Sequence, residues 1–230
     1  MIHQFLSTIP LLSTAVIRGT MTRREHSASI RVCAQTSGET SLEVSRLRSS
    51  GKSIVLIGLM GAGKSSVGKR LARCLELPFA DVDDEIVAVA GCSITDIFDI
   101  YGEDAFRDCE RRVIARMLEQ QCHVMATGGG AFMNAATRSE ISKRAVSVWL
   151  RADLVTLVER TSRRSDRPLL RGDNPRARLR SLMRERYPIY AEADIVVDTS
   201  QEPLEVTVQK VLQALAVARP IRQHPADGAS

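Results

Sequence analysis

The sequence predicts an α/β protein of three layers, in which a five-stranded parallel sheet is covered by helices on both faces. The run at 54–57 is continuous, apolar and partly β-branched, which is typical of a strand buried on both faces. The segment at 67–75 follows with its apolar residues on one helical face. Strands and helices then alternate along the chain, and this order favours parallel strands joined by helical crossovers.

The individual elements are placed by hydrophobic periodicity and by turn residues. The expected strands are 54–57, 78–82, 123–127, 146–150 and 195–197. The expected helices end near residue 77, at Gly91 and at Gly102, and further helices span 103–118, 153–163, 176–191 and 204–216. Ser93, followed three residues later by Asp96, nearly matches the capping-box motif, which predicts that a helix starts at Ser93.

The length and composition predict one principal domain. The 230 residues, 44% of them hydrophobic, can bury the core of one domain but hardly of two. We expect this domain at 51–217, a poorly ordered extension at 1–50 and a polar tail at 218–230. The first fifty residues are rich in Ser, Thr and Arg and lack Lys, a composition shared by transit peptides and disordered arms.

Charge, cysteines and hydropathy limit the classes of partner and compartment. The net charge of +5 suits the binding of anionic small molecules, but a basic surface could also bind nucleic acid or anionic lipid. Five scattered cysteines without a Cys-x-x-Cys pair argue against a closed disulfide framework and favour a reducing compartment. The apolar stretch at 9–17 is too short to span a bilayer. The charge alone does not decide the partner. We expect a cytoplasmic monomer that binds neither membranes nor nucleic acid.

The segment 58–65 reads Gly-Leu-Met-Gly-Ala-Gly-Lys-Ser and matches the Gly-x4-Gly-Lys-Ser pattern of a phosphate-binding loop. Its place between a buried strand and a helix is the one this mechanism requires, because backbone amides and the helix dipole then meet at the phosphate. Lys64 would bridge the terminal phosphates and Ser65 would offer its hydroxyl to Mg²⁺. The alternative is a glycine turn without a ligand. The expected nucleotide contacts in this loop are Gly61, Ala62, Gly63, Lys64, Ser65 and Ser66.

Asp81 and Asp83 come at the carboxyl end of the second expected strand. In a strand, residues two apart point to one side, and this edge of a parallel sheet is where ligands bind. One carboxylate could accept a proton from an attacking hydroxyl while the other holds the metal's water shell. The third expected strand lacks a terminal Asp, which leaves Asp81 or Asp83 as the metal partner. The alternative is that Asp81, Asp83 and Asp84 only cap the next helix.

Two further features lie at the same expected edge. Arg107 and Glu110 are three apart on one helix, so Glu110 could steady a guanidinium that forks toward a substrate carboxylate. A solvated salt bridge is the ordinary alternative. The glycines 128–130 directly follow a strand, which would let the backbone approach a ligand that side chains would block.

A basic loop at 162–175 predicts a lid. It contains Arg163, Arg164, Arg167 and Arg171 and could close over the phosphates, exclude water and bring an arginine to the transition state. A solvated basic loop is the alternative. Arg186, ahead of Tyr187, is either another acceptor ligand or surface charge near a helix end.

Taken together, these segments resemble the shikimate kinase family over about 52–215. The matching motifs are Gly-Leu-Met-Gly-Ala-Gly-Lys-Ser at 58–65, Asp-Val-Asp at 81–83, Phe-Arg-Asp-Cys-Glu at 106–110, Thr-Gly-Gly-Gly at 127–130, Arg-Pro-Leu-Leu at 167–170 and Glu-Arg-Tyr-Pro-Ile-Tyr at 185–190. The resemblance implies the P-loop kinase version of the three-layer fold. It also implies ATP and Mg²⁺ as cofactors and phosphorylation of the 3-hydroxyl of shikimate, in chorismate and aromatic amino-acid synthesis.

The resemblance also implies roles for individual residues. Shikimate would be held by Asp83, Arg107, Gly128, Gly129, Gly130 and Arg186, with both arginines on its carboxylate. Asp83 would orient or deprotonate the hydroxyl, and Ser65 with Asp81 would serve Mg²⁺. Lys64 and Arg167 would stabilise the moving phosphoryl group, so Lys64, Asp83 and Arg167 are the expected catalytic residues.

The nucleotide side departs from the family pattern at one point. Some relatives place an arginine against the adenine after the fifth strand, whereas this chain reads Thr-Ser-Gln-Glu at 199–202, which leaves Gln201 as the nearest candidate. Arg160 and Arg167 are further expected nucleotide contacts. The rival functions are a kinase for another hydroxylated metabolite such as gluconate and a non-catalytic ATP-sensing protein.

Overall fold

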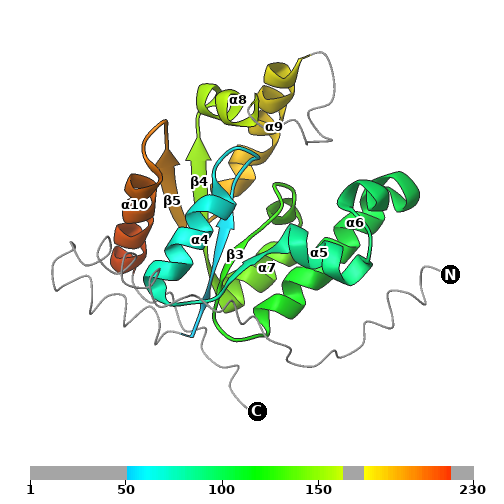
Figure 1. Cartoon of the computed structure of the whole chain (residues 1–230), viewed down its shortest axis with the longest axis horizontal. Helices are drawn as coiled ribbons and strands as arrows, with labels where there is room; N and C mark the ends of the chain where they lie inside the picture. Colours follow the sequence, from blue (N-terminus) through cyan, green and yellow to red (C-terminus); the bar gives the residue numbers. More distant parts are fainter. Residues whose placement is uncertain (1–50, 163–173, 219–230) are drawn as a thin grey trace, which may run out of the picture.

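A computed structural model describes residues 51–162 and 174–218, and its centre is a five-stranded parallel sheet in the order β2-β3-β1-β4-β5 (Figure 1). The strands are β1 (Ser53–Ile57), β2 (Phe79–Asp81), β3 (Val124–Ala126), β4 (Ala145–Ala152) and β5 (Ile195–Thr199). The helices are α4 (Lys64–Leu75), α5 (Val82–Ala90), α6 (Ile94–Leu118), η1 (Ala131–Met133), α7 (Ala135–Arg144), α8 (Leu154–Ser162), α9 (Pro175–Tyr190) and α10 (Leu204–Val217). The predicted fold class is confirmed.

β1 is the middle strand, which explains its apolar run at 54–57. All five of its residues are buried, and it pairs in parallel with β3 on one side and β4 on the other. Because every pairing in the sheet is parallel, the loops that follow β1, β2 and β3 leave the same edge. These are the phosphate loop, the start of α5 and the three glycines.

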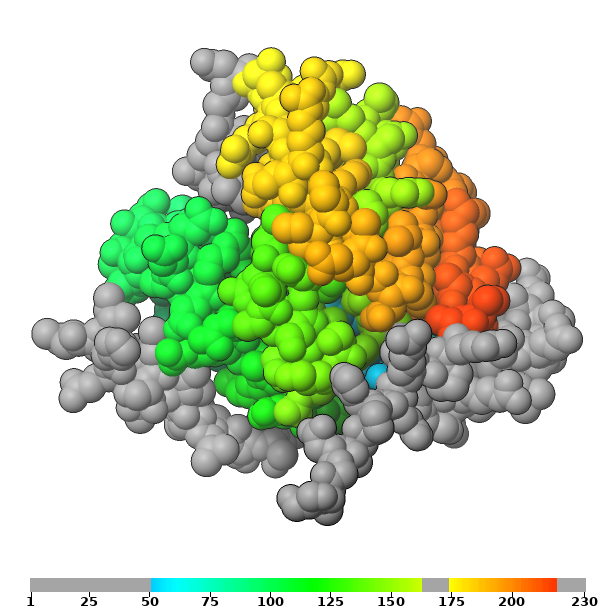
Figure 2. Space-filling view, turned by 180° about the vertical axis from the view of Figure 1, so that it is seen from behind, coloured from blue at the N-terminus to red at the C-terminus, as the bar shows by residue number. Residues whose placement is uncertain are grey.

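Helices cover both faces of the sheet, as expected. α4 packs on β1 and β3 and also contacts α10, while α6 and α7 pack together, with α7 against β4. In the view from behind, the green atoms of α7 and the yellow-to-orange atoms of α9 cover much of the visible face (Figure 2). No helix in the described part of the chain is long and apolar enough to cross a membrane.

The helix boundaries on the acceptor side follow the expected signals. Gly91 ends α5 in a left-handed conformation, and Ser93 starts α6 with a capping box in which Ser93 and Asp96 bond each other's backbone amides. At Gly102 the backbone leaves helical geometry, with φ 81° and ψ 173°. The sequence predicts two helices that meet at Gly102. In the structure they follow each other directly on either side of this kink and together form α6.

Two parts of the fold differ from the sequence prediction. η1 and α7 were not expected, because α7 is polar and buries only Thr137 and Ile141, so it gives little periodic signal. Asn134 starts α7, because its side-chain oxygen accepts hydrogen bonds from the backbone amides of Ala136 and Thr137. The second strand ends at Asp81, not at Val82, and α5 begins at once. This one-residue shift changes the geometry of the aspartates described below.

Candidate active site

The phosphate loop joins β1 to α4 and ends in a helix start without a side-chain cap. Gly61 and Gly63 have φ of 84° and 95°, a conformation that suits glycine, and Gly63 is the N-cap of α4. Lys64 folds back over the loop, where its ammonium donates to the carbonyls of Gly58 at 2.8 Å and Leu59 at 3.1 Å. Ala62 is buried within the loop, whereas Ser66 in the first helical turn is exposed. Because α4 starts without a side-chain cap, the backbone amides of its first turn can donate hydrogen bonds to an anion.

Ser65 and Asp81 meet beside the loop. The Ser65 hydroxyl donates to Oδ2 of Asp81 at 2.7 Å, although the two residues lie on α4 and at the end of β2. The other carboxylate oxygen, Oδ1, accepts the backbone amide of Asp83 at 3.2 Å and so caps α5. The expectation that Asp81 and Asp83 lie two apart in a strand was wrong, because Asp83 belongs to the first turn of α5. The capping alternative holds for Asp81, which has a second contact through Ser65.

Arg107 lies on α6 between two carboxylates. Its Nη1 donates to Glu110 Oε2 at 2.8 Å, the pairing that the sequence spacing indicated, while Nη2 and Nε donate to Glu103 at 3.1 and 3.3 Å. Burial alone would lower the pKa of the guanidinium, but Glu110 and Glu103 raise it overall. Glu103 is exposed and Glu110 is buried, so only the inner pair is shielded from water.

The three glycines pack against this arginine and its partner. A Cβ at Gly128 would lie 2.5 Å from Oε1 of Glu110 and 3.3 Å from Oδ1 of Asp83. A Cβ at Gly130 would overlap the guanidinium of Arg107. The sequence explains the glycines by the approach of backbone to a ligand. The structure adds a second reason, because Gly128 and Gly130 make room for Glu110 and Arg107.

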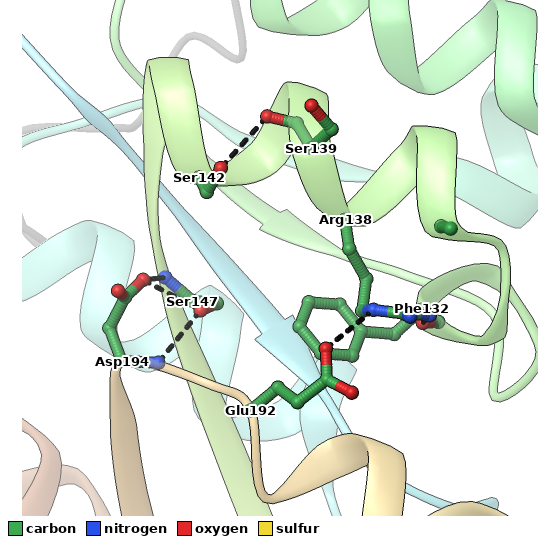
Figure 3. A pocket seen from close by; sticks show the side chains of 8 residues that line it. Phe132, Arg138, Ser139, Ser142, Ser147, Glu192 and Asp194 are labelled. Atoms are coloured by element: carbon green, nitrogen blue, oxygen red, sulfur yellow. Dashed lines mark hydrogen bonds and ion pairs between the residues drawn. The ribbon is translucent and has the colours of Figure 1, made fainter. Parts of the chain in front are cut away.

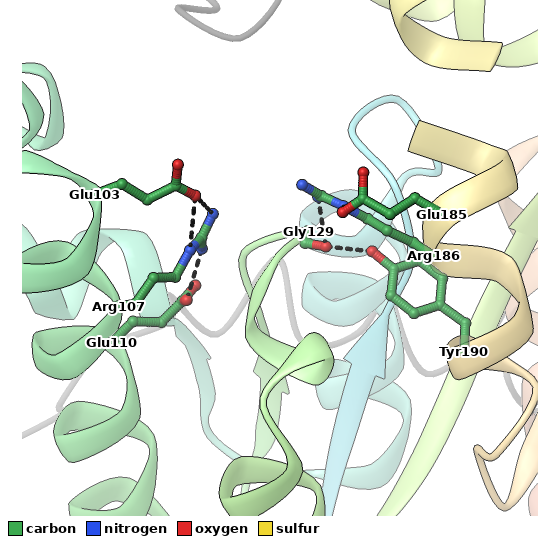
Figure 4. Close-up of polar contacts among 7 residues, drawn as sticks. All are labelled: Glu103, Arg107, Glu110, Gly129, Glu185, Arg186 and Tyr190. Carbon is green, nitrogen blue, oxygen red and sulfur yellow. Dashed lines mark hydrogen bonds and ion pairs between the residues drawn. The ribbon is translucent and has the colours of Figure 1, made fainter. Parts of the chain in front are cut away.

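Arg186 approaches the middle glycine from α9, on the opposite side. Its side chain is buried, and Nη1 donates to the carbonyl of Gly129 at 2.8 Å. The same carbonyl accepts the hydroxyl of Tyr190. Nε of Arg186 makes no hydrogen bond within the described residues, and a carboxylate oxygen of Glu185 lies 3.9 Å from it. Figure 4 shows the Arg107 and Arg186 groups facing each other from α6 and α9, with Gly129 on the Arg186 side.

The nucleotide side is assembled from α8 and the segment after β5. Nη1 of Arg160 lies 3.5 Å from the carbonyl oxygens of both Gly61 and Ala62, and Nη2 donates to the carbonyl of Ser200. The Gln201 amide donates to the Glu159 carboxylate. Arg160 thus links the phosphate loop to the segment that carries Gln201. Arg167 and the rest of the expected lid at 163–173 lie outside the described residues.

Comparison with known proteins gives the same reading of the chain. The family model described as shikimate kinase matches residues 60–216. The chain belongs to the shikimate kinase family. The shikimate kinase of Caulobacter vibrioides is 57% identical over 167 residues, which cover 73% of this chain and 84% of that protein. The shikimate kinase of Brucella canis is 47% identical over 182 residues, covering 79% of this chain and 91% of that protein.

A solved structure of this kinase family supports the fold as well. The shikimate kinase from Acinetobacter baumannii, in complex with shikimate, is 39% identical and superposes with a TM-score of 0.68, covering 70% of this chain and 91% of that one. The family consists of phosphotransferases that use ATP, so the chain is a kinase. The family resemblance of the sequence motifs is confirmed.

Two residues of this kinase site were missed in the sequence. Glu103 precedes Arg107 by four positions, a helical spacing that indicates pairing. Tyr190 follows Arg186 by four positions, which places both on one face of α9. Sequence periodicity could have found both as neighbours, but not the Gly129 carbonyl on which Tyr190 and Arg186 meet.

A cavity of about 320 Å³ lies away from this kinase site, near the amino ends of β4 and β5 (Figure 3). Its charged side chains already have protein partners. Arg138 pairs with Glu192 at 2.8 Å, and Asp194 accepts both the hydroxyl and the amide of Ser147, at 2.7 and 2.9 Å. The phosphate loop follows the opposite, carboxyl end of β1, so this cavity takes no part in the site.

Proposed function

We propose that this kinase transfers the terminal phosphoryl group of ATP to the 3-hydroxyl of shikimate, in chorismate and aromatic amino-acid synthesis. The observation that carries the proposal is the pair of guanidinium groups, Arg107 and Arg186, that face each other from α6 and α9. Two converging guanidinium groups suit a small substrate with one carboxylate, because each can donate charge-assisted hydrogen bonds to it. Shikimate has this carboxylate and a hydroxyl to accept the phosphoryl group.

On the acceptor side, Arg107 and Arg186 would bind the carboxylate, and the backbone of Gly128, Gly129 and Gly130 would line the ring. Asp83 would orient the 3-hydroxyl and accept its proton as the oxygen attacks. Its carboxylate is 3.3 Å from the Cβ position of Gly128, so it borders the same glycine segment as Arg107. The acceptor would thus be fixed at its carboxylate and activated at its hydroxyl.

On the nucleotide side, backbone amides from Gly61 to Ser66 would bind the phosphates at the start of α4. Lys64 would exchange its bonds to the Gly58 and Leu59 carbonyls for phosphate oxygens and, with Arg167, balance the charge of the moving group. Arg160 and Gln201 lie beside the loop and after β5, and we propose them as contacts to the rest of the nucleotide.

Ser65 and Asp81 are the proposed Mg²⁺ residues. They fit the ion, because both offer hard oxygen atoms, and their contact of 2.7 Å places these atoms together beside the phosphate loop. Mg²⁺ usually takes one or two protein ligands and completes its shell with water and phosphate oxygens. When bound, the ion would neutralise charge on the phosphates.

A coupled ATP assay across acceptors tests the proposal. With Mg-ATP, we expect turnover of shikimate to exceed that of gluconate and of nucleoside monophosphates by at least about 100-fold in kcat/KM. Asp83→Asn should bind ATP normally but lose about 100-fold or more in kcat, because the hydroxyl loses its base. Asp84→Asn is the matched control, since Asp84 is its exposed neighbour on α5, and it should leave turnover unchanged.

Other outcomes would favour the rival functions. Turnover of gluconate at the rate of shikimate would contradict the acceptor assignment. ATP binding without transfer to any acceptor would favour an ATP-sensing protein. The expected cytoplasmic location, monomeric state and lack of nucleic-acid binding stay predictions, which cell fractionation, sedimentation and a nucleic-acid binding assay would test.

A further inference from the structure

We infer that Tyr190 is a positioning residue for the acceptor, and that it acts through the Gly129 carbonyl on Arg186. This inference rests on the proposed function, in which Arg186 binds the shikimate carboxylate. Tyr190 is fully buried at the end of α9, one helical turn after Arg186. It lies beneath the site and would not touch the substrate itself.

One carbonyl oxygen holds both residues. The Gly129 oxygen accepts Nη1 of Arg186 at 2.8 Å and also accepts the Tyr190 hydroxyl (Figure 4). A carbonyl oxygen has two lone pairs, so these two donors satisfy it fully. The direction of the Arg186 guanidinium is therefore tied to the orientation of the Gly129 peptide, and Tyr190 holds that peptide.

The glycine segment needs such a constraint from outside. Three consecutive glycines have no side chains to limit their backbone rotation, and Gly128 and Gly130 must stay bare because of Glu110 and Arg107. A hydrogen bond from a buried ring is one way to fix the middle peptide without adding a Cβ. Loss of that bond would widen the range of Arg186 positions rather than remove the arginine.

Aromatic packing fixes the Tyr190 ring in turn. Its centroid lies 5.8 Å from Trp149 and 6.4 Å from Phe132, both in edge-to-face contact. Burial raises the pKa of Tyr190 to about 12, so the hydroxyl keeps its proton and stays a donor at neutral pH. A ring held on two sides keeps its hydroxyl on the Gly129 carbonyl.

Tyr187 supplies a matched control on the same helix. Its hydroxyl donates to the carbonyl of Ala152 at the end of β4, its ring packs 4.9 Å from Trp149, and burial raises its pKa to about 12 as well. Tyr187→Phe and Tyr190→Phe therefore each delete one hydroxyl bonded to a backbone carbonyl, with Tyr187 half-buried and Tyr190 fully buried. Only Tyr190 is bonded to the glycine segment.

The experiment compares these two variants in the full-length protein. Tyr190→Phe should raise the KM for shikimate, and its Kd measured by calorimetry without ATP, about fivefold, the loss expected for one hydrogen bond. Its KM for ATP should stay unchanged, and kcat should change less than about twofold. Both variants should lower the Tm by a similar amount. Tyr187→Phe, however, should leave shikimate binding as in the wild type.

A double-mutant cycle separates positioning from general loosening. In an Arg186→Ala background, Tyr190→Phe should have no further effect on the Kd for shikimate, because its effect passes through Arg186. Equal effects of Tyr187→Phe and Tyr190→Phe, or a full Tyr190→Phe effect without Arg186, would overturn the positioning role alone. Wild-type protein that fails to bind shikimate would overturn the proposed function and this inference together.

Discussion

Glu110 is the residue whose environment is most at odds with its chemistry. It is buried, Oε2 bonds Arg107, and Oε1 has no hydrogen-bond partner within the described residues. Burial raises the pKa of this carboxyl, against the opposing effect of Arg107, and the nearby Asp83 adds to the rise. Because Glu110 must be ionised to hold Arg107, the proposed binding of the acceptor carboxylate by Arg107 would depend on pH.

The sign of this dependence follows from the raised pKa. Between the ordinary Glu value and the raised value, the folded state binds more protons than the unfolded state, so ionising Glu110 reduces stability as pH rises through that window. Substrate binding has the opposite need. As pH falls through the raised pKa, Glu110 takes up a proton and its ion pair with Arg107 is lost.

We therefore expect the KM for shikimate to rise as pH is lowered through the raised pKa of Glu110 toward the ordinary Glu value. Glu110→Gln should have a raised KM, by about tenfold, that no longer changes over this range, because the titrating group is gone. Steady-state kinetics at constant ATP measures both. Glu103→Gln is the control, since it removes the exposed partner of Arg107 and leaves Glu110 to titrate. The same pH profile in the wild type and Glu110→Gln would contradict the assignment.

At the scale of elements, the site depends on how closely the glycine segment after β3 approaches α6. A Cβ at Gly130 would occupy the place of the Arg107 guanidinium, which is the end of a flexible side chain. A Cβ at Gly68, within α4, would lie 2.5 Å from the Phe79 ring, which is partly buried and packs against the hydrophobic core. The same chemical change thus meets the end of an arginine side chain in one place and an aromatic ring packed on the core in the other.

Gly130→Ala should raise the KM for shikimate about tenfold or more, because Arg107 must move aside and its ion pair with the buried Glu110 is weakened. Gly68→Ala should instead lose about 1–3 kcal/mol in stability and keep a near-normal KM. Urea unfolding and steady-state kinetics on both variants check this. A large stability loss with unchanged KM for Gly130→Ala would contradict the close packing of Arg107 on the glycine segment.

At the scale of the whole molecule, the described residues already contain a closed fold. The sheet has its five strands, and the hydrophobic core draws on elements from β1 to α10. The family model matches 60–216, and the Caulobacter relative aligns with 73% of the chain. These observations support the proposal that 51–217 is the catalytic domain and that 1–50 and 218–230 are additions to it.

A protein that starts at residue 51 should therefore keep the kinetic constants of the full chain within about twofold and its Tm within about 2 °C. Thermal unfolding and the coupled assay on both proteins provide the measurement. A start at residue 58 is the negative control, because it removes β1, the middle strand of the sheet, and should abolish folding. A large loss of Tm on removing 1–50 alone would show that the extension belongs to the fold.

The sequence by itself determined the features that depend on neighbours along the chain. The apolar run at 54–57 specifies a buried strand, the Gly-x4-Gly-Lys-Ser loop specifies an anion site before a helix, and the Arg107–Glu110 spacing specifies a pair. Each signal has a range of a few residues, which is the range of strand alternation, helix periodicity and turn geometry. The sequence did not predict α7 or the exact end of β2, because neither has a clear local pattern.

Only the tertiary structure decided which of these pieces meet. Arg186 and Tyr190 bond a carbonyl 57 and 61 residues away, and Ser65 on α4 reaches Asp81 at the end of β2. Glu110 and Arg107 require bare glycines from the far end of β3. No local pattern encodes a backbone carbonyl as a partner, because every residue carries one. Sheet order and helix packing select the Gly129 carbonyl, and with it the geometry of the acceptor site.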